Sequence, residues 1–170
     1  MIDIELIQAC KRQDRIAQKM LYTLLLPKLY ATCKQYVTEH TDIEDILSEA
    51  FVSIFTKIEQ LTSEAAIVSW ARKITVNQCL AFLRQRKTFE TLSDDYKDAE
   101  PIHQPESRDI FQLVNHLPEH SRLVFNLAVV EGYSHKEIAV LLQISEGTSK
   151  SQLHYAKSKL KHWLSKIAVL

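Results

Sequence analysis

Glycine and proline are scarce in this chain of 170 residues, which has two glycines and four prolines. All-β folds use these residues at many of their turns, so their scarcity argues against such a fold. Apolar residues make up 46% of the chain and charged residues 25%, as in a globular protein. We therefore predict an all-α fold with one large or two small domains.

Cysteine is also sparse, and Cys10, Cys33 and Cys79 are scattered without any C-x-x-C spacing. This pattern argues for a reducing compartment and against a disulfide framework or a structural zinc site. The seven histidines do not cluster either, so we expect no metal and no cofactor. No apolar run approaches the about 18 residues of a membrane helix, and the N-terminus does not resemble a signal peptide, so we expect a cytoplasmic protein.

The motifs of common enzyme classes are missing as well. We find no glycine-rich phosphate loop, no metal-ligand spacing and no nucleophile with a nearby candidate base. The sequence therefore predicts a binding protein and not an enzyme.

The net charge is zero, but the charges are sorted along the chain. Residues 39–69 hold seven acids and one cation, whereas residues 70–87 hold five cations and no acid. Residues 88–109 hold seven acids and two cations, and residues 146–170 hold five lysines and one glutamate. Because local patches set phosphate affinity more than the total charge does, the two basic segments are candidates for contact with nucleic acid.

Residues 132–160 predict two helices joined by a tight turn. Ser134 and Glu137 have the spacing of a capping box, and Gly132 suits the left-handed residue that ends the preceding helix. Ser145 is placed to cap the second helix. Such a pair of helices predicts a helix-turn-helix unit.

The predicted second helix of this unit has two faces. Helical periodicity groups apolar residues on one side: Leu153, Ala156, Leu160 and Trp163. The other side groups polar residues: Lys150, Ser151, His154, Tyr155, Ser158 and Lys161. A recognition helix in the major groove of DNA needs such a polar face, although a merely solvated face would have the same spacing.

Two further helices are predicted in the first half of the chain, after an amphipathic segment over 4–37 that we expect to break near Pro27. The first helix follows a capping box at Thr41 and Glu44, and its outer face is acidic. Acids in a first turn are favoured by the helix dipole alone, but they also suit a basic partner. The second helix begins at Ser69 and carries the cations of residues 70–87.

These motifs, in this order, resemble those of extracytoplasmic-function (ECF) sigma factors, small bacterial RNA polymerase subunits that confer promoter specificity. Asp45, Glu49 and Phe51 match the family's D-x-x-Q-E-x-F pattern. Two further patterns of the family, W-x-x-R-I-x-x-N and L-R-x-R, are matched at Trp70, Ile74, Asn77, Leu83, Arg84 and Arg86. The C-terminal signature is matched at Leu117, Pro118, Arg122, Gly132, Ser134, Glu137, Ile138, Ser145, Gly147 and Thr148.

The resemblance implies two helical domains joined by an acidic linker: sigma domain 2 over 1–87, the linker over 88–109, and sigma domain 4 over 110–170. It implies that the β′ clamp helices of RNA polymerase core dock on Asp45, Ser48, Glu49 and Val52. It implies that the break from Leu61 to Val68 and the helix after it read the promoter minus-10 element, with contacts at Ser63, Arg72, Lys73, Asn77, Arg84 and Arg86. Contacts with the minus-35 element fall to Thr148, Lys150, Ser151, His154 and Tyr155. It also implies that domain 4 binds the polymerase β flap, and that an anti-sigma factor is a partner.

Several positions depart from the family pattern. Ser48 replaces a common glutamine, Gln143 a frequent glycine, and Ser149 a usual core valine, while Gln152 and Tyr155 replace frequent arginines. Two other hypotheses therefore stay open. The first is a sigma-like interaction protein that binds polymerase, or binds a regulator, without opening promoters. The second is a stand-alone helix-turn-helix repressor.

Overall fold

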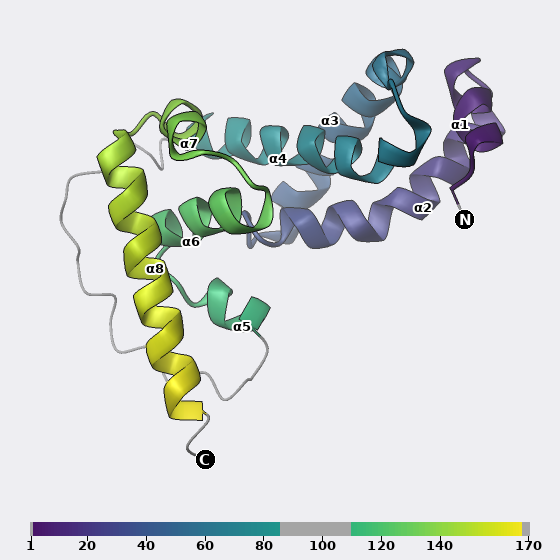
Figure 1. The fold of residues 1–170 in the computed structure, drawn as a ribbon. Helices are drawn as coiled ribbons and strands as arrows, with labels where there is room; N and C mark the ends of the chain where they lie inside the picture. The colour runs from purple at the N-terminus through teal and green to yellow at the C-terminus, as the bar shows by residue number, and fades with distance from the viewer. Residues whose placement is uncertain (1, 86–109, 168–170) are drawn as a thin grey trace. The chain divides into compact units, whose positions relative to one another are not determined.

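The computed structural model describes residues 2–85 and 110–167. The chain divides into two compact units, Met1–Arg86 and Lys87–Leu170, and each is described by itself. Every regular element in the described residues is a helix, and no strand occurs among them (Figure 1). The predicted all-α fold is therefore confirmed. The linker expected over 88–109 lies outside the described residues.

The first unit is a bundle of four α-helices. They are α1 (Ile4–Lys11), α2 (Arg15–Cys33), α3 (His40–Lys57) and α4 (Ile67–Gln85), with short 3-10 turns η1 (Ile58–Gln60) and η2 (Glu64–Ala66) between the last two. Helices α2, α3 and α4 pack against one another, and α1 packs on α2. The apolar spacing predicted for α3 is confirmed, because Ile43, Ile46 and Ile54 are buried.

Three expectations about helix boundaries in this unit were wrong. Helix α4 begins at Ile67, two residues before the predicted Ser69. The first segment does not break at Pro27, which lies inside α2, but at the turn before Asp14, where Gln13 has φ +62°. The surrounding bundle holds α2 together although proline lacks an N–H group. Helix α3 begins at His40, before the predicted cap, with Glu39 at the N-cap position and no side-chain cap hydrogen bond.

The second unit is built on one long helix, α8 (Glu146–Ile167). The shorter elements are α5 (Ile110–Asn115), α6 (Glu119–Phe125), the π-helix η3 (Asn126–Val130) and α7 (His135–Leu142), and three of these helices, α5, α6 and α7, pack against α8. The core contains Leu113, Val114, Leu117, Phe125, Ala156 and Leu160, with Leu153 and Trp163 packed against it. The apolar face predicted for the long helix is therefore confirmed.

None of the helices in the described parts combines the length and the apolar composition that crossing a bilayer needs. Within the same residues, no group of three or more histidine, cysteine, aspartate or glutamate side chains is arranged to hold a metal ion.

Candidate functional site

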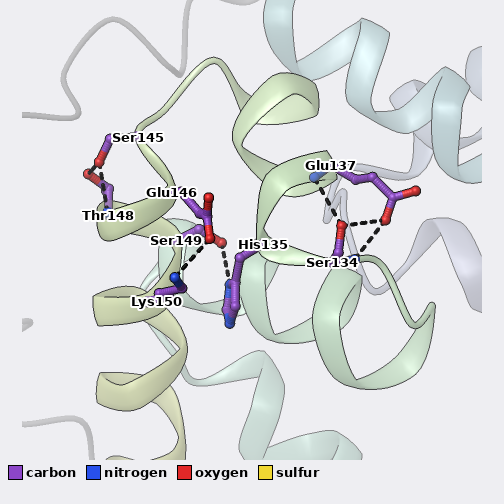
Figure 2. Close-up of polar contacts among 8 residues, drawn as sticks. All are labelled: Ser134, His135, Glu137, Ser145, Glu146, Thr148, Ser149 and Lys150. Atoms are coloured by element: carbon purple, nitrogen blue, oxygen red, sulfur yellow. Dashed lines mark hydrogen bonds and ion pairs between the residues drawn. The ribbon is translucent and has the colours of Figure 1, made fainter.

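The helix-turn-helix begins with the predicted capping box. The Ser134 backbone N–H donates to the Glu137 carboxylate at 2.8 Å, and the Glu137 N–H donates to Ser134 Oγ at 3.3 Å (Figure 2). Gly132 has φ +77°, as expected for the residue that ends the preceding helix. These contacts fix the start of α7.

The turn ends α7 with a left-handed residue and then caps α8. Gln143 has φ +56° at the C-cap of α7, where glycine would be free of the Cβ clash. Ser145 Oγ accepts a hydrogen bond from the Thr148 N–H at 2.9 Å, which confirms its predicted capping role (Figure 2). The sharp turn sets where the first residues of α8 point.

A hydrogen bond that the sequence did not indicate joins α7 to α8. His135 Nδ1 lies 2.9 Å from Ser149 Oγ, and the figure shows the ring of His135 turned toward α8 (Figure 2). Ser149 is fully buried, so its hydroxyl needs such a partner. The polar residue at this usual valine position is therefore accommodated by pairing across the turn.

The polar face of α8 remains open to solvent at its N-terminal end. Lys150, Ser151 and His154 are exposed, while Thr148 and Tyr155 are half-buried. Lys150 Nζ lies 2.8 Å from Glu146 Oε1, and the two side chains are 60% and 50% exposed. Because water screens an exposed pair of this kind, it contributes little to stability.

The ion pair with Lys150 changes the pKa of Glu146. The hydrogen bond from Lys150, followed by the charge of that lysine, lowers the pKa of the Glu146 carboxyl below its ordinary value. The ion pair therefore favours the ionised form of this carboxyl.

Two residues at family arginine positions have other contacts here. Gln152 Oε1 accepts a hydrogen bond from Ser121 Oγ of α6 at 2.5 Å, so this side chain ties α8 to the unit's interior. The Tyr155 ring lies under Lys159 Nζ, 5.4 Å from the ring centroid. At the N-terminal end of α8, the exposed polar face is therefore formed mainly by Lys150, Ser151 and His154.

A second basic face lies on α4. Lys73, Asn77 and Arg84 fall on one side of this helix by their spacing, and all three are exposed. Arg72 is turned by about 100° from Lys73, is half-buried, and lies with Nη2 3.4 Å from Gln35 Oε1. Arg72 is thus apart from the other predicted minus-10 residues of this helix.

The other predicted minus-10 residues lie outside α4. Ser63 is exposed in the segment Leu61–Ala66 between η1 and α4. Arg86 lies outside the described residues.

An acidic face runs along α3. Asp45, Ser48, Glu49 and Val52 follow at i, i+3, i+4 and i+7, share one side of the helix and are all exposed, Val52 at 63%. The Ser48 hydroxyl donates to the Glu44 carbonyl at 2.9 Å and so projects little beyond the helix. This face adjoins a groove of about 680 Å³ between α2 and α3, lined by Tyr22, Leu26, Pro27, Tyr30, Glu44, Leu47 and Ser48.

Sequence reasoning missed a polar cluster at the other end of this unit. Gln8 and Lys11 of α1 contact Glu64 of η2. Their separation of more than 50 positions leaves no periodic or motif signal, so only the fold brings them together.

Both units match models of one family. The model for Sigma-70 region 2 matches residues 21–89, and the model for Sigma-70, region 4 matches residues 107–160. The ECF RNA polymerase sigma factor SigM of Mycobacterium tuberculosis is 30% identical over 165 residues, which cover 95% of this chain and 84% of that protein. The ECF RNA polymerase sigma-E factor of Haemophilus influenzae is 24% identical over 178 residues, which cover 94% of this chain and 94% of that protein.

A solved structure shares the fold. The structure of CnrH in complex with the cytosolic domain of CnrY matches with a TM-score of 0.55 at 18% identity, over 98% of this chain and 99% of that one. Two region models in the expected order and a relative of this identity and coverage decide the family. The chain therefore belongs to the ECF sigma factors of the sigma-70 family, the subunits that bind RNA polymerase and direct transcription initiation.

Proposed function

We propose that this sigma factor docks on RNA polymerase core through the acidic face of α3, opens the minus-10 element with the segment Leu61–Ala66 and the basic face of α4, and reads the minus-35 element with α8. The observation that carries the proposal is the separation of charge into one acidic and two basic exposed faces. Each face lies on a different helix, as separate partners require. Met1–Arg86 then serves as sigma domain 2, and Lys87–Leu170 holds sigma domain 4.

Docking uses opposite charge and apolar contact together. Asp45 and Glu49 supply exposed carboxylates to the basic side of the β′ clamp helices, which steers association. Val52 and the neighbouring groove between α2 and α3 supply apolar surface. Because Ser48 bonds its own helix, it contributes less than a glutamine at this position would.

Promoter opening uses another helix of the same unit, α4, and the segment before it. A melted strand needs cations for its backbone and a pocket for an unstacked base. Lys73 and Arg84 supply exposed cations, Asn77 an exposed amide, and Ser63 lies on the segment that would hold the base. Arg72, whose Nη2 lies 3.4 Å from Gln35 Oε1, is on another side of α4 and apart from this face.

Minus-35 recognition uses the N-terminal end of α8. Lys150 offers a donor to phosphates and base edges, and His154 follows one turn later on the same exposed face. Ser151 is exposed on this face too, but its hydroxyl donates to the Thr148 carbonyl at 3.0 Å, so it offers mainly an acceptor. Tyr155 and Thr148 are half-buried and position this face more than they read it. Domain 4 also binds the β flap, for which a groove of about 510 Å³ lined by Ile110, Phe125, Lys157, Leu160, Lys161, Leu164 and Ser165 is the candidate surface.

The chain acts in the cytoplasm beside polymerase, as a regulatory subunit without catalysis of its own, and an anti-sigma factor is its further partner. A selection of random duplex DNA on the reconstituted holoenzyme tests the proposal. We expect enrichment of a bipartite motif, with its upstream half lost in the Lys150→Ala His154→Ala variant. If the wild-type holoenzyme enriched no bipartite motif, or if the variant enriched the same two halves as wild type, the assignment of α8 and Leu61–Ala66 would be contradicted.

A further inference from the structure

The N-terminal helix α1 lies against the segment that connects α3 to α4. In the first unit, α1 contacts both η1 and η2, and Figure 1 shows it at the same end of the bundle as that connection. The Gln8 amide donates to Glu64 Oε1 at 2.7 Å. Lys11 Nζ lies 3.6 Å from the same oxygen and donates to the Leu61 backbone carbonyl at 3.1 Å. Two side chains of α1 thus hold the first residue, Leu61, and the middle, Glu64, of the six-residue segment Leu61–Ala66.

These contacts are more than an exposed surface pair. The side chains of Lys11 and Glu64 are only 20% and 26% exposed, so solvent screens their attraction less than that of the Lys150 pair on α8. Lys11 satisfies a backbone carbonyl at the same time, and Gln8 donates to the ionised carboxylate, which makes a charge-assisted hydrogen bond. The cluster therefore restrains the segment in a defined place.

The segment itself divides into anchored and free residues. Leu61 is buried at one end, and Ile67 is buried just after the other. The backbone hydrogen bonds are short-range, from the Leu61 N–H to Ile58 and from the Ala66 N–H to Ser63. Thr62, Ser63 and Ala65 are exposed between the anchors. Short-range backbone hydrogen bonds shape this segment. Side chains of α1 add hydrogen bonds that tie the segment to a part of the chain 50 or more positions away.

We propose that Gln8 and Lys11 are positioning residues that hold Leu61–Ala66 in the conformation that receives the minus-10 base. The inference rests on the proposed function, which assigns this segment to the minus-10 element. A base pocket discriminates only when its walls are fixed before the base arrives, and supporting side chains provide that fixation. Helix α1 would then set promoter selectivity without touching DNA.

Amide hydrogen exchange on the free chain tests the restraint. We expect Gln8→Ala and Lys11→Ala to raise exchange of the Leu61–Ala66 amides by about fivefold, since each removes a charge-assisted contact. Lys11→Arg keeps a cation and donors and should restore the protection. Lys19→Ala removes an exposed lysine of α2 and is the matched control, expected to behave as wild type. Unchanged exchange in both α1 variants would overturn the proposal.

Transcription with the reconstituted holoenzyme tests the consequence. On promoters that differ in single minus-10 bases, Gln8→Ala and Lys11→Ala should reduce discrimination between the preferred base and the others by about fivefold. Discrimination should return with Lys11→Arg. A uniform loss of transcription with unchanged base preference would show a merely structural role and overturn the proposal.

Substitutions in the segment itself separate this inference from the proposed function. If Thr62→Ala and Ser63→Ala change base preference while the α1 variants do not, the positioning role fails and the minus-10 assignment stands. If none of the four variants changes it, the minus-10 assignment fails, and the positioning role fails with it.

Discussion

At the scale of single residues, two glutamines adopt a left-handed backbone that costs about 1 kcal/mol for a residue with a Cβ atom: Gln13 at φ +62° and Gln143 at φ +56°. Gln143→Gly should raise the free energy of unfolding of the second unit by about 0.5 kcal/mol, because glycine relieves the clash but gains freedom when unfolded. Chemical denaturation of the full chain measures this. Gln112→Gly in α5 is the control and should lower stability, because it places glycine inside a helix. If Gln143→Gly lowered the free energy of unfolding as much as Gln112→Gly does, the left-handed backbone at Gln143 would not be a source of strain.

The hydrogen bond between His135 and Ser149 gives a second prediction at this scale. Ser149→Ala leaves the His135 ring nitrogen without this partner and opens a small space in the interior, so it should cost about 1 kcal/mol of unfolding free energy. Ser149→Val fills the space with apolar volume and should cost less. Thermal unfolding compares the two variants, and a double-mutant cycle with His135→Ala isolates the coupling. A coupling energy of zero would show that the contact adds no stability.

At the scale of elements, α8 carries the same pair of residue types twice. Lys150 and His154 lie on the proposed reading face, and His162 and Lys166 repeat the spacing near the C-terminal end, also exposed. Lys150→Ala with His154→Ala should weaken promoter binding about tenfold, and it should make the affinity depend less steeply on salt because a phosphate contact is lost. Binding of holoenzyme to labelled promoter DNA at several salt concentrations measures both effects. His162→Ala with Lys166→Ala should leave them unchanged; equal losses in both double variants would reject the groove assignment.

Helix α3 yields the matching prediction for polymerase. Asp45→Arg reverses a charge at the N-terminal end of the acidic face and should abolish binding to core polymerase in a pull-down. Glu5→Arg makes the same reversal on an exposed position of α1 and should bind as wild type does. Retention of Asp45→Arg on polymerase at wild-type level would remove α3 from the docking surface.

The same scale shows what could be predicted from the sequence. Periodicity and capping chemistry predicted α7, the turn and α8, because these signals are local: Ser134, Ser145 and Gly132 act on residues within a few positions. The continuation of α2 through Pro27 could not be predicted, since tertiary packing overrides the local preference there. The contacts of Gln8 and Lys11 with Glu64 join residues far apart in the chain, and no local pattern encodes them.

At the scale of the whole molecule, the charge pattern of the sequence maps onto separate surfaces although the net charge is zero. Unit 1 carries an acidic face on α3 and a basic one on α4, and unit 2 carries a basic face on α8. Opposite charges on different helices of one unit allow it to bind a protein and a nucleic acid at once. In keeping with the family assignment, we propose polymerase as the partner of the acidic face and promoter DNA as the partner of the two basic faces.

Run-off transcription tests the central claim most directly. Purified chain is added to bacterial core polymerase with templates that carry the regions upstream of its own and neighbouring genes. We predict a discrete transcript that depends on this chain and disappears with Asp45→Arg. Polymerase binding without any such transcript would favour a sigma-like interaction protein, and absence of polymerase binding would leave a stand-alone helix-turn-helix protein. Either result would contradict the claim that this chain directs initiation.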